Sequence, residues 1–126
     1  MPNEAEMGHV YTPVTFIGPS GESQTLTMLV DTGASYTWIS EEILRALDVR
    51  PLRPRRFRLG DGRVIERQLG EVVVEIQGDR ATTIVVFGQP GDVTVLGVYA
   101  LEGVALEVDP AEGVLRPMEL LFLATA

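Results

Sequence analysis

The 126-residue sequence contains no cysteine and a single histidine, His9. Without cysteine the chain can form no disulfide and perform no thiol chemistry, and such a composition suits a reducing compartment. One histidine is too few for a histidine-based triad or for a multi-histidine metal site within one chain. Carboxylates and hydroxyls therefore remain as the candidate reactive groups.

Lysine is also absent, so all ten basic residues are arginines, against 18 acidic residues and a net charge of −8. An acidic balance of this size argues against nucleic acid or an anionic membrane as a partner. The acidic residues are dispersed and form neither a calcium-loop nor a His-Glu pattern, so we expect no metal and no cofactor.

No apolar run is long enough to span a membrane, because Glu102 and Glu107 interrupt the richest stretch, residues 93–108. The acidic start, MPNEAEM, does not resemble a signal peptide. We therefore expect a soluble, cytoplasmic protein. Its length and its 45% hydrophobic content are typical of one globular domain, here residues 1–126.

Short β-rich segments separated by glycine-containing turns dominate the chain. Segments 10–17 and 25–30 predict one hairpin, and segments 71–76 and 80–87 predict a central hairpin with apolar residues on both faces. Gly-Asp-Gly at 60–62 predicts a hairpin tip. The pattern is typical of an all-β barrel or sandwich. Further strands are expected at 36–39, 93–97, 104–108 and 114–123.

Helical signals are few. Ser40 predicts the N-cap of a short helix that ends near Asp48, with Glu41 and Arg45 spaced to pair on its surface. Residues 98–102 predict a single helical turn. The arginine-rich stretch RPLRPRRFR, residues 50–58, could grip an acidic ligand, but a solvated, proline-broken connector is the favoured interpretation.

The stretch LVDTGAS, residues 29–35, places an ionisable group where an apolar strand ends. A carboxylate there is costly unless it is hydrogen-bonded or used, so Asp31 either caps its own turn or performs chemistry. Ser35 and Ser40 have neither a nucleophile-elbow motif nor a nearby histidine. Acid–base chemistry by carboxylates remains, and it ordinarily takes two acids. Two copies of Asp31 across a two-fold axis would supply them.

This stretch resembles the active-site motif of retropepsin-like aspartic proteases, the single-domain enzymes that act as homodimers. The late stretch Val95-Leu96-Gly97 is similar to a second motif of that family, and residues 58–64 stand where the family carries its flap hairpin. Residues 71–88 resemble the strand pair that follows the flap. The resemblance covers residues 10–109 and is greatest toward the bacterial and archaeal branch.

The resemblance implies a small closed β-barrel with one or two short helices, acting as a homodimer without a cofactor. It also implies that Asp31 of each subunit activates a water, that Thr32 links the two loops, and that Gly33 lets a peptide backbone approach. The substrate would be an extended peptide with apolar side chains beside the cut. Substrate contacts are expected from Ala34, Ser35, Trp38, Phe57, Leu59, Gly60, Asp61, Gly62, Val64, Val93 and Val95, and support of the active-site loop from Leu96 and Gly97.

Two features depart from the viral members of the family. Val98 and Tyr99 stand where those members carry Arg followed by Asn or Asp, which brace the loop and the dimer. The chain also continues through a C-terminal extension, residues 110–126, expected to add a strand to the dimer sheet or to cover an apolar edge. A non-catalytic homodimeric peptide-binding or assembly module is the alternative function, and a small-ligand β-barrel is a third.

Overall fold

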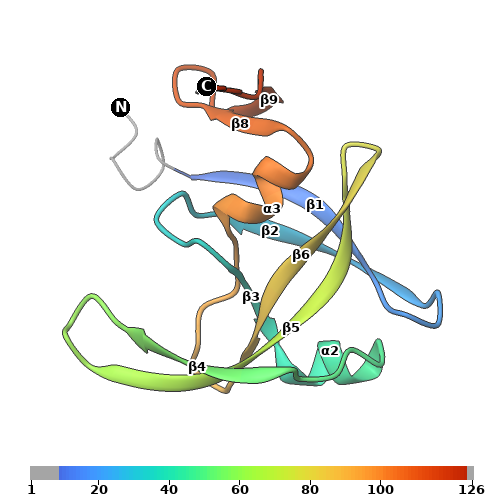
Figure 1. Cartoon of the computed structure of the whole chain (residues 1–126), viewed down its shortest axis with the longest axis vertical. Coiled ribbons are helices and arrows are strands. Elements are labelled where there is room, and N and C mark those ends of the chain that lie inside the picture. Colours follow the sequence, from blue (N-terminus) through green and yellow to red (C-terminus); the bar gives the residue numbers. More distant parts are fainter. Residues whose placement is uncertain (1–8, 125–126) are drawn as a thin grey trace.

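The computed structural model describes residues 9–124, and strands make up most of its regular structure (Figure 1). The first two strands, β1 (Val10–Ile17) and β2 (Ser23–Val30), pair antiparallel from Val10 opposite Val30 to Ile17 opposite Ser23. The predicted N-terminal hairpin is therefore confirmed. Buried residues alternate with more exposed ones along β1, which buries Val14 and Phe16 completely.

Nine further elements follow in chain order. Seven strands form one sheet in the order β1-β2-β7-β3-β6-β5-β4, and β1 also pairs with β5. The pairs β2–β7 and β3–β6 are parallel, whereas β5 and β6 form the predicted central antiparallel hairpin. The remaining elements are β3 (Thr37–Ser40), α2 (Glu41–Ala46), β4 (Arg53–Arg58), β5 (Val64–Ile76), β6 (Asp79–Gly88), β7 (Val95–Leu96), α3 (Val98–Gly103), β8 (Leu106–Asp109) and β9 (Val114–Pro117).

The two short helices begin where the sequence predicts them. The Ser40 hydroxyl accepts the backbone N–H of Ile43 at 3.2 Å and so caps α2. Glu41 and Arg45 pair on its surface at 2.7 Å, while Leu44 is fully buried. No helix among residues 9–124 is long and apolar enough to cross a membrane.

The prediction of a connector at residues 50–58 is wrong, because β4 occupies Arg53–Arg58. β4 is the last strand of the sheet and pairs antiparallel with β5, from Arg53 opposite Leu69 to Arg58 opposite Val64. Pro54 is tolerated at such an edge, where one side of the strand needs no hydrogen bonds. The partner strand thus imposes an extended conformation that the local sequence does not signal.

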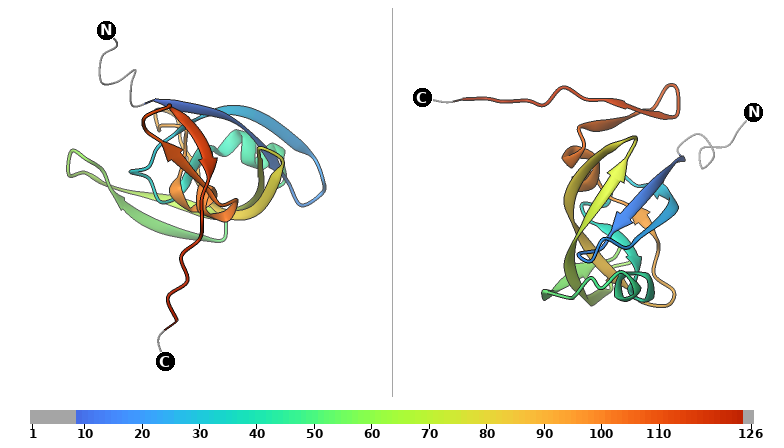
Figure 2. Two further views of the ribbon diagram at one scale, coloured as in Figure 1. Left: turned by 90° about the horizontal axis from the view of Figure 1, so that it is seen from above. Right: turned by 90° about the vertical axis from the view of Figure 1, so that its right-hand side faces the viewer.

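Two other predicted strands are shorter than expected. β7 contains only Val95 and Leu96, and Val93 lies outside it with 64% of its surface exposed. β9 ends at Pro117, so residues 118–124 are not a strand and run away from the sheet (Figure 2). Phe122 in this tail is 87% exposed, so no described residue covers its apolar side chain.

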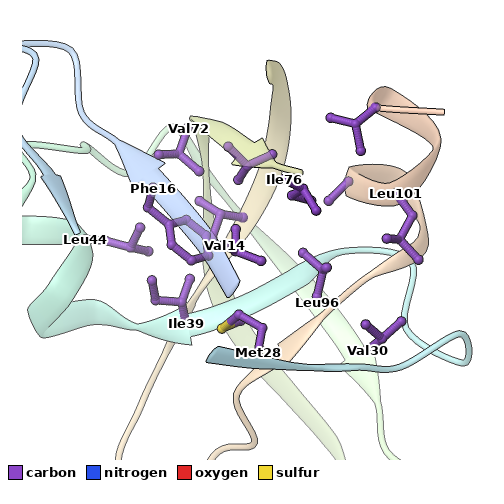
Figure 3. Close-up of a cluster of buried hydrophobic side chains, with 14 of the residues drawn as sticks. Val14, Phe16, Met28, Val30, Ile39, Leu44, Val72, Ile76, Leu96 and Leu101 are labelled. Atoms are coloured by element: carbon purple, nitrogen blue, oxygen red, sulfur yellow. The ribbon is translucent and has the colours of Figure 1, made fainter. Parts of the chain in front are cut away.

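One apolar cluster packs the sheet against both helices (Figure 3). Phe16 from β1, Ile39 from β3 and Leu44 from α2 lie together and are fully buried. Leu96 from β7 is equally buried in the same cluster. The core therefore reaches the strand that immediately precedes Gly97, which ties the loop around Asp31 to the best-packed part of the molecule.

Candidate active site

Asp31 lies directly after β2 and organises the turn that follows it. Its Oδ1 accepts the backbone N–H of Gly33 at 2.9 Å, and its backbone carbonyl accepts the N–H of Ala34 at 3.1 Å. These are the bonds of an Asp-initiated turn, so Asp31 does cap its own turn. The residue is nevertheless exposed, which leaves its carboxylate accessible for chemistry.

The segment 95–99 passes between the two ends of this turn and bonds to both. The N–H of Asp31 donates to the Leu96 carbonyl at 3.0 Å, and the N–H groups of Val98 and Tyr99 donate to Ala34 and Ser35 at 2.8 and 3.1 Å. β7 pairs parallel with β2 on one side and antiparallel with β3 on the other. The position of Asp31 is therefore set by backbone hydrogen bonds from a remote part of the chain.

Gly97 lies at the centre of this crossing. Its N–H donates to the buried Thr37 hydroxyl at 3.0 Å. A Cβ atom at Gly97 would lie 2.8 Å from the Ser35 carbonyl oxygen, closer than real Cβ contacts allow. Only glycine therefore lets the strand pass beneath the active-site loop at this distance.

The turn borders a groove of about 530 Å³ between the Asp31 loop and the β4–β5 hairpin. Asp31 is the only carboxylate that lines it among the described residues, and most of the other side chains are apolar or aromatic. An extended peptide would need such a surface for its side chains. The lining residues are Asp31, Gly33, Ala34, Ser35, Tyr36, Trp38, Phe57, Arg58, Leu59, Gly60, Val93, Val95 and Tyr99.

Aromatic contacts connect the elements around the groove. The Phe57 ring, on β4, lies 4.9 Å from Trp38 and 6.4 Å from Tyr36, centroid to centroid. Tyr99, at the start of α3, lies 5.5 Å from Tyr36. All three contacts are edge-on, an arrangement that aromatic rings prefer. The groove wall is thus assembled from three elements that are distant in sequence.

Most residues expected to be catalytic or to contact substrate line this groove, but four do not. Thr32 lies beside it on the exposed turn, and Asp61 and Gly62 lie at the hairpin tip. Val64 lines a separate depression with Arg56 and Arg58. Sequence reasoning missed three lining residues: Tyr36, which directly follows the motif, Arg58, which precedes the hairpin tip, and Tyr99, noted only as a departure from the viral pattern.

Asp61 stabilises the hairpin tip. Its carboxylate accepts the backbone N–H of Arg63 at 3.0 Å and the Arg63 Nε–H at 2.7 Å. These two hydrogen bonds hold the pKa of Asp61 below its usual range. Gly62 adopts a φ of 90°, which glycine adopts without strain, so the tip is a well-defined turn.

A second carboxylate anchors the hairpin to the loop before β7. Asp92 accepts two hydrogen bonds from Arg67 of β5, at 2.7 and 2.9 Å, and the backbone N–H of Gln89 at 2.7 Å. The Arg67 hydrogen bonds hold the pKa of Asp92 below its usual range. The pair is largely buried, with 19% and 14% of the two side chains exposed, so it can fix the hairpin arm against the body.

Among the described residues, no three His, Asp or Glu side chains gather as metal ligands. The site therefore offers one exposed carboxylate beside an aromatic groove and under a hairpin. A carboxylate can exchange protons with a bound water, but acid and base roles at the same moment require a second titratable group. Within residues 9–124, one chain brings no second carboxylate into the groove.

Comparison with known proteins agrees with this geometry. Residues 20–103 match a family model described as gag-polyprotein putative aspartyl protease. The matched region is two thirds of the chain and includes the Asp31 turn, the β4–β5 hairpin and Gly97. No curated protein matches the sequence. The chain therefore belongs to the gag-polyprotein aspartyl protease family, a group of retropepsin-like aspartic proteases.

Proposed function

We propose that this protein is an aspartic endopeptidase that acts as a homodimer, with Asp31 of one copy facing Asp31 of the other. The observation that carries the proposal is the exposed carboxylate of Asp31, held in a turn by the 95–99 segment and bordering an aromatic groove. A single carboxylate is half of the required acid–base pair. A second copy related by a two-fold axis supplies the other half with identical geometry.

Two carboxylates at hydrogen-bonding distance cannot both ionise, so the pair holds one proton between them. The ionised Asp31 takes a proton from a bound water as the water oxygen adds to the scissile carbonyl carbon. The protonated Asp31 gives its proton to the carbonyl oxygen. The C–N bond then breaks as the Asp31 that received the water proton gives it to the leaving nitrogen. The other, ionised Asp31 takes a proton from a hydroxyl of the tetrahedral diol, which becomes the new carboxyl group, so the pair again holds one proton.

The substrate is an extended peptide with apolar side chains beside the cut. Trp38, Phe57 and Val95 supply apolar wall on one side of Asp31. Leu59 and Gly60 lead into the hairpin tip, which serves as the flap over the bound peptide. Backbone pairing of the peptide provides affinity, and the groove side chains provide preference.

In this chain, backbone hydrogen bonds and ring packing hold the active-site loop, a role that polar and charged side chains have in the viral members. The N–H groups of Val98 and Tyr99 bond the Asp31 loop directly, and the Tyr99 ring packs against Tyr36. The departure at these two positions is therefore compatible with a fixed active-site loop.

The β1–β5 pairing supports a closed barrel, because it links the first strand of the sheet to the strand beside β4. Three expectations stay predictions. They are a single domain with a core at 10–109 and an extension at 110–126, a cytoplasmic location, and membership of the bacterial or archaeal branch.

Cleavage of casein between pH 4 and 7 tests the proposal. Wild-type protein is expected to cut, and Asp31→Asn is expected to lose on the order of 10³-fold or more in rate. Asp79→Asn, at the exposed β5–β6 turn, is the matched control and retains activity. A folded wild-type protein that cuts nothing, or an Asp31→Asn variant that cuts equally, would favour the peptide-binding module instead.

A further inference from the structure

The arginines of this acidic protein gather on one arm. Six of the ten lie between residues 50 and 63: Arg50 just before β4, four in β4 and Arg63 at the hairpin tip. Asp61 is the only acidic residue of this segment. The β4–β5 hairpin projects from the body of the molecule (Figure 1). The arm is therefore a local region of positive charge on a chain whose net charge is −8.

In the part of the chain that the structure describes, the arginines outside residues 50–63 form ion pairs, whereas most of those within this segment do not. Arg45, Arg67, Arg80 and Arg116, which lie outside this arginine-rich segment, each pair with an Asp or Glu at 2.7–2.8 Å. Within the segment, Arg63 pairs with Asp61, and Arg50 reaches Asp48 only at 3.9 Å. Among residues 9–124 no carboxylate lies within 4 Å of the remaining four guanidinium groups, those of Arg53, Arg55, Arg56 and Arg58.

Arg58 connects this unneutralised charge to the groove. It lines the groove with Asp31, and it also lines a depression of about 270 Å³ with Arg56 and Val64. Its Nη1 donates to the Gly62 carbonyl at 3.1 Å, and its guanidinium carries further N–H groups for a ligand. A peptide that leaves the aromatic groove beside Arg58 therefore meets a second arginine next to it.

We propose that this arm selects substrates in which acidic residues flank the apolar segment to be cut; the inference rests on the proposed function. Guanidinium groups bind carboxylates through paired, charge-assisted hydrogen bonds. An extended peptide can place the carboxylates of its Asp or Glu side chains beside Arg56 and Arg58. Nucleic acid is the less favoured occupant, because the remainder of the molecule is strongly acidic and repels a polyanion at long range.

Binding is tested with two fluorescent peptides that share an apolar Leu-Phe centre and carry either three Glu or three Gln on one flank. Asp31→Asn protein, which leaves the peptide intact, is titrated at 50 mM and at 500 mM NaCl. The Glu peptide is expected to bind about three- to tenfold more tightly at low salt, as two exposed ion pairs would give, and the preference is expected to shrink at high salt. Adding Arg56→Glu should abolish the preference, whereas adding the control Arg80→Glu, with the same charge change, should keep it.

Cleavage by the otherwise wild-type protein separates this inference from the proposed function. Preferred binding of the Glu peptide without cleavage of either peptide would uphold the arm as a recognition surface and overturn the protease. Cleavage of both peptides at equal rates would uphold the protease and overturn the inference, leaving the arginines as edge charges that oppose aggregation. Tighter binding of a single-stranded DNA 20-mer than of the Glu peptide would also overturn it.

Discussion

A Cβ atom at Gly97 would lie 2.5 Å from the backbone carbonyl oxygen of Tyr36. Neither the loop that contains Tyr36 nor the segment that contains Gly97 can move away. The N–H groups of Val98 and Tyr99 hydrogen-bond the loop, and Leu96, beside Gly97, is fully buried. Adding a methyl group at Gly97 would therefore displace the loop that carries Asp31.

Gly97→Ala is expected to lower the free energy of unfolding by about 3 kcal/mol, because the added methyl group overpacks a backbone crossing. Urea denaturation measures the change. Gly60→Ala is the control, since a Cβ atom there meets nothing within 4 Å. Equal urea midpoints for the two variants would contradict the packing described for Gly97.

Thr37→Val is expected to destabilise the protein by about 1–3 kcal/mol, because it leaves the buried N–H of Gly97 without its acceptor. Thr83→Val is the matched control. Thr83 is 5% exposed, and its hydroxyl has no hydrogen-bond partner among the described residues. The Thr83→Val substitution should be neutral or stabilising. The unfolding temperatures of the two variants should therefore shift in different directions or by clearly different amounts.

Asp92→Asn is expected to remove a pH-dependent part of the stability. The pKa of Asp92 is lower in the folded protein than in the unfolded chain, so its contribution is fully present above the unfolded value, about 3.9, and is lost as the pH falls through the folded value. The variant should be less stable by about 1.5–3 kcal/mol at pH 7, the range of hydrogen bonds to charged groups.

Urea unfolding of both proteins from pH 7 to pH 3 measures this difference, which should narrow below about pH 4 as Asp92 becomes protonated. Asp79→Asn at the exposed β5–β6 turn is the control. A difference that stays constant over this range would show that the Arg67–Asp92 hydrogen bonds do not set the effect.

Mixing tests whether two copies of Asp31 form one site. Adding an equal amount of Asp31→Asn protein to a fixed amount of wild type should lower the cleavage rate by about half after subunit exchange, because half of the wild-type subunits then pair with the variant. Adding Asp79→Asn protein instead should raise the rate. An unchanged rate with the Asp31→Asn protein would mean that each chain acts alone.

Local signals predicted much of the fold. The β-branched run at 10–17, the Ser40 cap and the Gly-Asp-Gly tip each contain their own conformational preference, and each element lies where expected. The strand β4 contains no such preference. Arginines and prolines dominate it, and its extended form comes from pairing with β5 over Arg53–Arg58.

The sequence points to the centre of the candidate site more directly than to the walls of the groove. The Asp31 motif is contiguous, and most of the residues expected around it line the groove. Tyr36 and Tyr99 were missed because their role depends on a ring contact between two remote segments. Val64 lies outside the groove and lines a separate depression with Arg56 and Arg58, a placement that depends on how the β4–β5 hairpin packs and not on the local sequence.

The hydrogen bond between Gly97 and Thr37 joins residues 60 positions apart, and it has a consequence for the nascent chain. At a synthesis rate of 5–20 residues per second, roughly 3 to 12 seconds separate the two residues as they leave the ribosome's catalytic centre. During that interval the Asp31 turn has been synthesised, but the 95–99 segment that hydrogen-bonds it has not. Assembly of the site must therefore wait until most of the chain has been translated, so an incomplete product released early would not contain it.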